Sequence, residues 1–305
     1  MSVALITHPD CTRHEMGEGH PESPGRLFAI QDLLISTGLD AVLRHDDAPL
    51  ATREQLIAVH DPAYVDHIFQ VAPQSGYVAL DPDTRMCSQT LPAALRAAGA
   101  VVQAIDQVMR QEVQQAFCAV RPPGHHAERD RAMGFCVFNN VAVGVGYALA
   151  HYPLERVAVV DFDVHHGNGT EDIFRNDPRV LLCSTFQHPF YPYSPVQNHE
   201  HLVEVPLAAG TSGAAYRQAF ETQVLPALER FQPELILISA GFDAHREDPL
   251  AQLRLEDADY TWITRRIRDV AERFAAGRIV SVLEGGYALN ALARSVVAHL
   301  QALIG

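Results

Sequence analysis

Short continuous runs of apolar residues alternate along the chain with longer segments whose apolar residues recur at helical spacing. The short runs predict buried strands, because a strand covered on both faces is apolar at nearly every position. The spaced segments predict helices with one face on the core. Expected strands cover residues 3–7, 116–120, 157–160, 179–185, 202–207, 235–239 and 278–283, and expected helices cover residues 26–36, 61–69, 90–109, 141–150, 214–230, 256–275 and 289–303. This alternation is typical of a three-layer α/β/α fold with a mainly parallel, doubly wound central sheet.

The alternation continues to the last residue without a linker, so we expect the 305 residues to form a single domain spanning positions 1–305. Hydrophobic residues make up 48% of the chain and charged residues 20%, which is ordinary for a soluble protein. No apolar run approaches the roughly 20 residues of a membrane span, and the start of the chain lacks the pattern of a signal peptide. We therefore expect a soluble, cytoplasmic protein that does not engage a membrane.

Cysteine content and charge narrow the classes further. The five cysteines form no CxxC pair, which fits a reducing compartment and argues against a disulfide framework or a thiolate zinc site. The formal net charge of -14 argues against nucleic acid as a partner, because sequence-independent binding to nucleic acid needs a basic surface. Neither cysteine content nor charge indicates the oligomeric state.

The most unusual segment is RVAVVDFDVHHGNGT, at residues 156–170. Acids and histidines follow the carboxyl end of a buried strand, and Asp161, Asp163 and His165 would share one side of the backbone if the strand continued. Gly167 and Gly169 then allow a turn towards a helix that begins near residue 170.

A buried carboxylate at this place must be paired or must coordinate a metal, because an unpaired one costs several kcal/mol. Aspartate with histidine, without cysteine, favours zinc, which at catalytic sites takes three protein ligands and leaves one position for water. Asp163 and His165 supply two ligands. Asp243, just past the strand at 235–239, is the candidate for the third.

Other unusual loops follow other expected strands, and in this architecture ligands bind outside the carboxyl ends of the strands. They include the pair His125 and His126 in RPPGHH and Tyr287 in LEGGY. Each residue alone also has an ordinary explanation. The two histidines suit an exposed turn, Asp243 suits a helix cap or a turn, and Tyr287 suits a half-buried structural position.

Five segments together resemble the zinc-dependent histone deacetylase family, which has the arginase/deacetylase fold. These segments are RPPGHH at 121–126, GFCVFNN at 134–140, DFDVHHGNGT at 161–170, SAGFDAHREDPL at 239–250 and LEGGY at 283–287. The asparagine in HHGNG is most similar to the class II branch and its bacterial relatives. The resemblance extends from GEGHPESPGRL, at residues 17–27, to the end of the chain.

The resemblance implies a role for each matched residue. Asp163, His165 and Asp243 become the zinc ligands, His126 the general base, His125 the assisting histidine held by Asp161, Asn168 the partner of His126, and Tyr287 the residue that polarises the substrate carbonyl. Gly134 and Phe135 would form one wall of an acyl-lysine channel, with Phe190 or Tyr191 opposite and Leu250 nearby. The family's potassium position would match Asp161, Ser184 and Thr185, so the implied cofactors are Zn²⁺ and K⁺.

These residues predict hydrolysis of an acyl amide, because an amide needs a Lewis acid on its carbonyl, an activated water and a donor for the oxyanion. Acetylated lysine in a protein is the favoured substrate. Relatives specialised for polyamines can carry an acid near position 250, where this chain has Leu250. An acetylated polyamine or another small amide or ester is the alternative.

Two further alternatives use the same fold. A catalytically silent acyl-lysine binder is disfavoured by the presence of Tyr287, and release of no acetate on binding acetyl-lysine would support it. A binuclear manganese ureohydrolase would need further acid ligands after the DxH motif, where this chain has His166 and Gly167. Two manganese ions per chain would support that second alternative.

Overall fold

An eight-stranded sheet forms the centre of the molecule in the computed structural model, which describes residues 3–305. The strands lie in the order β2-β1-β5-β10-β9-β6-β7-β8, and each pairing between neighbours is parallel. Their bounds are β1 Val3–Thr7, β2 Arg44–Asp47, β5 Gln115–Cys118, β6 Val157–Asp161, β7 Val180–Gln187, β8 Leu202–Leu207, β9 Leu235–Ala240 and β10 Ile279–Leu283. A separate two-stranded antiparallel hairpin contains β3 (Val78–Ala79) and β4 (Arg85–Met86).

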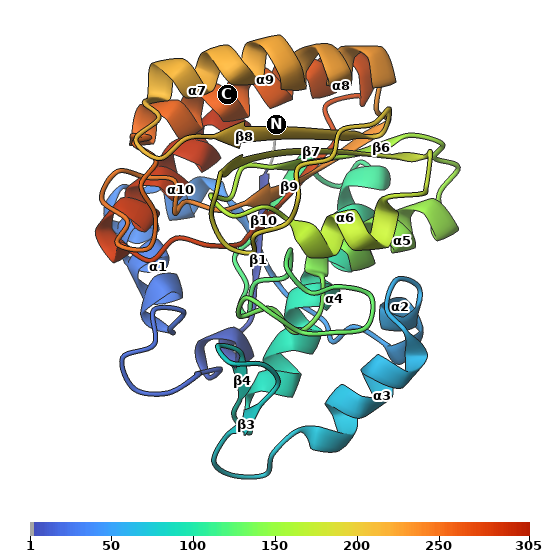
Figure 1. Cartoon of the computed structure of the whole chain (residues 1–305), viewed down its shortest axis with the longest axis vertical. Helices are drawn as coiled ribbons and strands as arrows, with labels where there is room; N and C mark the ends of the chain where they lie inside the picture. Colours follow the sequence, from blue (N-terminus) through green and yellow to red (C-terminus); the bar gives the residue numbers. More distant parts are fainter. Residues whose placement is uncertain (1–2) are drawn as a thin grey trace.

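Helices cover both faces of the sheet. The longer ones are α1 (Gly25–Ser36), α3 (Pro62–Val71), α4 (Thr90–Met109), α5 (Asn140–His151), α9 (Asp257–Phe274) and α10 (Leu289–Ile304), and the shorter ones are α2 (Arg53–Ile57), α6 (Asn168–Phe174), α7 (Gly213–Ala219) and α8 (Leu225–Phe231). Figure 1 shows α7, α8 and α9 on one side of the sheet and α5 and α6 on the other. Helix α10 packs between α1 and α9, and α4 packs on α5. This arrangement confirms the predicted three-layer α/β/α fold class.

The apolar runs identified the interior strands because those strands are buried along their whole length. All five residues of β6 and all six of β9 are buried. Strand β2, with the sequence RHDD, was not predicted, because it lies at the edge of the sheet and is mostly exposed. An edge strand has one neighbour, so its sequence need not be apolar.

The helix expected at 214–230 is instead divided into three parts. A π-helical segment, η3 (Phe220–Val224), separates α7 from α8. Pro226, in the first turn of α8, has no backbone N–H to donate to the preceding turn. Such a gap in the hydrogen-bond ladder is a recognised cause of a local change in helix geometry.

Small residues in α4 allow neighbouring segments to pack closely against this helix. Ala93, Ala97 and Ala100 are fully buried there, and a Cβ atom at Gly99 would lie 2.0 Å from the carbonyl oxygen of Pro49. Within the described residues, no helix is long and apolar enough to cross a membrane.

Candidate functional site

Five loops converge at one edge of the sheet, after the carboxyl ends of β5, β10, β9, β6 and β7. These strands are consecutive neighbours in the sheet, and because they are parallel, their carboxyl ends lie at the same edge. The loops carry the residue pairs and motifs that the sequence analysis identified. The topology therefore brings together residues that are far apart in the sequence.

Strand β6 ends at Asp161, earlier than a continued strand through His165 would require. The Asp161 carboxylate accepts a hydrogen bond from the Asp163 amide at 3.1 Å, which replaces a ladder partner and turns the chain. A continued strand is therefore not what places Asp161, Asp163 and His165 near one another. Helix α6 begins at Asn168, two residues before the expected position.

Asp163, His165 and Asp243 nevertheless lie together, as a zinc site requires. His165 Nδ1 is 3.0 Å from Asp163 Oδ1 and 3.3 Å from Asp243 Oδ2. The other carboxylate oxygens are held by the backbone: the Gly285 amide donates to Asp163 Oδ2 at 2.8 Å, and the Val164 amide donates to Asp243 Oδ1 at 2.9 Å. One oxygen of each acid is thereby left to face the imidazole.

The donor set fits a divalent cation. Asp243 is fully buried, and its Oδ2 has no hydrogen-bond partner within residues 3–305. Burial, with the neighbouring Asp163, raises the pKa of Asp243 to about 7, while His165 opposes that rise. A bound cation would favour the ionised carboxylate. A Cβ atom at Gly241 would lie 2.0 Å from Asp163 Oδ2, and one at Gly285 would lie 2.1 Å from Asp243 Oδ2. The two glycines leave room for the carboxylates.

His125 and His126 lie beside these donors, and each has a different partner. His125 Nδ1 is 2.9 Å from Asp161 Oδ2, whereas His126 Nδ1 is 2.7 Å from Asn168 Oδ1. Burial, with the neighbouring His125 and His165, lowers the pKa of His126 well below its ordinary value. Burial also opposes charge on His125, but Asp161 and Asp163 outweigh it and raise the pKa of His125 well above its ordinary value.

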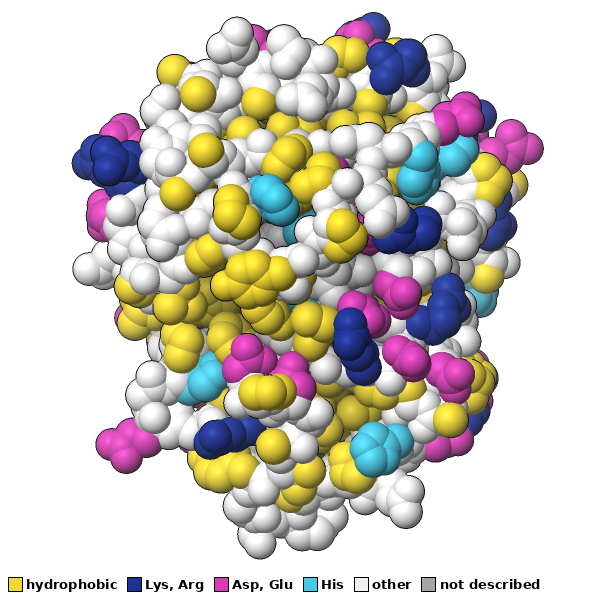
Figure 2. Space-filling view, in the orientation of Figure 1, with side chains coloured by type: hydrophobic (Ala, Val, Ile, Leu, Met, Phe, Trp, Pro, Cys, Tyr) yellow, Lys and Arg dark blue, Asp and Glu magenta, His cyan; other side chains and the backbone are white. Residues whose placement is uncertain are grey.

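A channel with a volume of ≈ 210 Å³ leads to this group. Its lining is Asp83, His126, Gly134, Phe135, His165, Phe190, Tyr191, Leu250 and Tyr287. Both aromatic candidates for the wall opposite Phe135 contribute: Phe190 stacks on His165 with ring centroids 5.2 Å apart, and Tyr191 meets His126 edge-on at 5.2 Å. Figure 2 shows hydrophobic side chains gathered across the middle of the face that it presents.

Phe135 has the backbone geometry of a constrained position. Its φ is 68°, in the left-handed region that non-glycine residues seldom adopt. Its amide donates to Thr84 Oγ1 at 3.0 Å, and its ring lies 6.0 Å from that of Tyr287, at 86°. Such backbone strain is concentrated at functional sites in proteins.

Tyr287 is held from both ends. Its amide donates to Asp248 Oδ2 at 2.7 Å, and the Arg26 guanidinium lies 5.1 Å from its ring centroid. Burial raises the pKa of Tyr287 well above its ordinary value, while Arg26 opposes that rise. The hydroxyl therefore keeps its proton at neutral pH and remains a hydrogen-bond donor.

The residues matched to a potassium position also lie together, on β6 and β7. Asp161 and Ser184 are partners in the strand register. Thr185 Oγ1 donates to the Asp161 carbonyl oxygen at 3.4 Å and is 2.6 Å from the hydroxyl oxygen of Tyr216. All three residues are buried.

His166, next to the zinc candidate His165, contacts a different pair of acids. Its Nε2 is 2.5 Å from Glu171 Oε2 and 3.2 Å from Glu204 Oε1, and the three side chains could together hold a metal. Arg175 already contacts Glu171. One imidazole and one guanidinium thus face two carboxylates.

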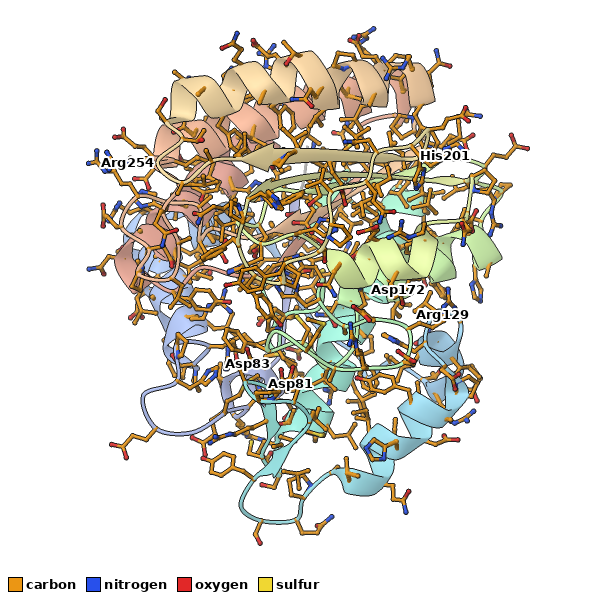
Figure 3. The ribbon with its side chains drawn as sticks, in the orientation of Figure 1. Asp81, Asp83, Arg129, Asp172, His201 and Arg254 are labelled. Carbon is orange, nitrogen blue, oxygen red and sulfur yellow. The ribbon has the colours of Figure 1, made fainter. Side chains whose placement is uncertain are left out.

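Three acids that line the channel or hold its loops were not predicted from the sequence. Asp83 lines the channel, Asp248 holds the Tyr287 amide, and Glu284 Oε2 accepts hydrogen bonds from the amides of Gly124 (2.7 Å) and His125 (3.2 Å). Asp248 and Glu284 lie inside the motifs SAGFDAHREDPL and LEGGY, so their positions gave a signal. Asp83 lies in the loop between β3 and β4, beside Asp81, and nothing in the sequence connected that hairpin to the channel (Figure 3).

Comparisons with known proteins agree with this geometry. Residues 20–303 match the histone deacetylase domain family. A histone deacetylase-like amidohydrolase from Pseudomonas aeruginosa is 41% identical over 88% of this chain and 73% of its own length. The polyamine deacetylase HDAC10 of Mus musculus is 37% identical, and the alignment covers 100% of this chain and 48% of that protein.

A solved structure, that of the HDA15 HD domain, superposes on the whole of this chain. The TM-score is 0.94 at 34% sequence identity, and the match covers 88% of that domain. This likeness confirms the predicted arginase/deacetylase fold. The chain therefore belongs to the histone deacetylase family, whose members are generally zinc-dependent, and it is a deacetylase.

Proposed function

We propose that this deacetylase uses zinc to remove acetyl or related acyl groups from acylated lysine side chains. One observation carries the proposal: His126, His165 and Tyr287 all line a single narrow channel. A base, a metal ligand and an oxyanion donor are thus presented to one substrate group. We also propose that the chain folds as a single deacetylase domain.

Asp163, His165 and Asp243 would hold the zinc ion. Zinc bound there would polarise the substrate carbonyl and lower the pKa of the attacking water. Three protein ligands leave positions open for water and substrate. Asp161, Ser184 and Thr185 would hold a potassium ion behind the histidine pair.

The two histidines would move the protons. His126 is uncharged at neutral pH because its pKa is lowered, so it can accept a proton from the attacking water. His125 keeps its proton, because Asp161 and Asp163 favour its charged form. The pair can therefore return a proton to the departing amine, which would otherwise leave as an unstable anion.

The Tyr287 hydroxyl would donate a hydrogen bond to the oxyanion of the tetrahedral intermediate. Phe135, Phe190 and Leu250 would contact the apolar methylene groups of a lysine side chain along the channel. An apolar channel of this kind excludes water and strengthens the polar interactions at its end.

An acetylated polyamine is the second candidate substrate, and Asp83 favours it. This acid lines the channel together with Leu250, so a carboxylate is available for a second ammonium on a small substrate. Burial, with the neighbouring Asp81, raises the pKa of Asp83 to about 6, so the carboxyl group is mainly ionised at pH 7.

The experiment compares acetate release from an acetyl-lysine peptide and from acetylspermidine, using zinc-loaded protein and Tyr287→Phe. We expect the variant to lose roughly 100-fold in kcat with little change in KM, because it loses a donor used in the transition state. Zinc content measured in both proteins serves as the control, since Tyr287 is not among the metal donors.

The ratio of kcat/KM for the two substrates decides between the candidates. Faster turnover of the peptide supports acyl-lysine, and faster turnover of acetylspermidine supports the polyamine. Wild-type-like kcat in Tyr287→Phe would contradict the role of the tyrosine. Zinc binding without acetate release from either substrate would contradict the proposed function.

A further inference from the structure

The asparagine beside the proposed general base creates a chemical ambiguity. Asn168 Oδ1 lies 2.7 Å from His126 Nδ1, but a side-chain amide has an acceptor oxygen at one end and a donor NH₂ at the other. If the oxygen faces the imidazole, Nδ1 must carry the proton and Nε2 is free to act as a base. If the NH₂ faced it, Nε2 would carry the proton and could not accept another.

The surroundings of the Asn168 NH₂ group remove this ambiguity. Nδ2 is 2.7 Å from Glu128 Oε1, 3.2 Å from Met133 Sδ and 3.4 Å from the carbonyl oxygen of His126. All three atoms are acceptors, and the Glu128 contact is both the shortest and the one with a charged acceptor. A flipped amide would place its oxygen against the carboxylate at this distance, which is repulsive.

Glu128 is itself fixed in place. Arg131 binds it with both ends of the guanidinium, from Nε to Oε2 at 2.6 Å and from a terminal nitrogen to Oε1 at 2.8 Å. The Glu128 carbonyl oxygen accepts from His60 Nδ1 at 2.9 Å. The same loop is attached to α6, where the Arg129 amide donates to Asp172 Oδ2 at 3.0 Å, and Figure 3 shows these two residues side by side.

We infer that Glu128 is a positioning residue for the deacetylation reaction. It orients the Asn168 amide so that the amide oxygen accepts from His126 Nδ1 and the Nε2 lone pair of His126 remains available as the base. Glu128 acts through Asn168 and does not contact the substrate. The inference depends on the proposed role of His126 for its effect on the rate, but its effect on the tautomer of His126 can be measured without any substrate.

Two variants at this position test the inference. Glu128→Ala removes the acceptor, so the Asn168 amide can adopt both orientations, and we expect kcat to fall roughly tenfold with KM unchanged. Glu128→Gln keeps a carbonyl oxygen that can accept from Asn168, and we expect it to retain most of the activity.

Arg131→Ala is the matched control, because it removes the ion pair on the same loop while the hydrogen bond from His60 to the Glu128 carbonyl oxygen still anchors the backbone of Glu128. We expect this variant to remain within about twofold of the wild-type kcat, since an exposed ion pair contributes little by itself. A fall equal to that of Glu128→Ala would assign the effect to the loop as a whole and would overturn the inference.

The direct measurement is the tautomer of His126, obtained from ¹⁵N chemical shifts in zinc-loaded protein labelled at histidine. His126→Ala identifies the resonances. We expect the Nδ1–H form in the wild type and in Glu128→Gln, and a mixture of tautomers in Glu128→Ala. An unchanged Nδ1–H form in Glu128→Ala would overturn the inference, whatever happens to the rate. Absence of deacetylase activity in every protein would contradict the proposed function and leave this measurement valid.

Discussion

Leu250 presents an apolar side chain to the channel. Its amide donates to Asp248 Oδ1 at 3.0 Å, so the backbone that carries it is fixed. A charged side chain at this place would line the same channel as Asp83. The residue at position 250 is therefore suited to control the choice between an acyl-lysine peptide and a small cationic amine.

We expect Leu250→Glu to raise the kcat/KM ratio of acetylspermidine to acetyl-lysine peptide by roughly tenfold, the equivalent of about 1.4 kcal/mol for one partly desolvated charge pair. Leu250→Gln is the matched control, because it has a similar size without the charge. Steady-state kinetics on both substrates measure the effect. An equal shift in the two variants would show that side-chain shape, and not charge, determines the preference.

Single residues were predictable from the sequence where they follow a buried strand. Asp163 and Asp243 are polar residues next to apolar runs, and they lie together because β6 and β9 are parallel neighbours in the sheet. Glu128 was not predictable, because its role depends on a contact with Asn168, 40 residues away in the sequence. Asp83 was missed for the same reason, since only the folded hairpin brings it to the channel.

At the scale of elements, Asp248 joins two catalytic loops. One of its oxygens accepts from the amides of Tyr287 and Ala288, at 2.7 and 3.2 Å, and the other accepts from the amide of Leu250. The loop after β9 and the loop after β10 are thus held to one carboxylate. Tyr287 and Leu250, on two different loops, are positioned together.

Asp248→Ala should lower kcat by roughly tenfold and the free energy of unfolding by roughly 2–3 kcal/mol, because it leaves buried amides without an acceptor. Glu247→Ala is the control: this neighbouring acid is half exposed and pairs with Arg294 at the surface, so its removal should change both quantities little. Kinetics and urea unfolding measure the two effects. Wild-type kcat in Asp248→Ala would show that the carboxylate does not position Tyr287.

Helices and strands were predictable where burial requires apolar residues at regular positions. The start of α6 was placed too late, because Asn168 and Gly169 suggest a turn when read without their partners. In the fold, the Gly169 amide donates to the His125 carbonyl oxygen at 3.1 Å, and a Cβ atom at position 169 would lie 2.2 Å from the carbonyl oxygen of Ala127. This contact with a distant loop, and not local preference, allows the helix to begin there.

At the scale of the whole molecule, His299 on α10 connects this helix to α9 and to the central strand β10. Its Nδ1 is 2.6 Å from Thr264 Oγ1 on α9, and its Nε2 is 2.9 Å from Ser281 Oγ on β10. The ring also packs edge-on against Phe117 and Phe242, with centroids 5.7 and 5.9 Å away. Both nitrogens are satisfied by neutral hydroxyl groups. Burial therefore lowers the pKa of His299 to about 3.

This lowered pKa predicts a specific sensitivity to acid. Between pH 6.5 and pH 3 the unfolded chain binds a proton at His299 that the folded chain does not, so the free energy of unfolding falls as the pH falls. For a shift of this size, the contribution of His299 to the free energy of unfolding is about 2 kcal/mol smaller at pH 5 than at pH 7. His299→Gln removes the titrating group, so its loss of stability between pH 7 and pH 5 should be about 2 kcal/mol smaller than that of the wild type. Urea unfolding at the two pH values measures the difference, with the surface variant His151→Gln as the control, and an unchanged loss in His299→Gln would contradict the argument.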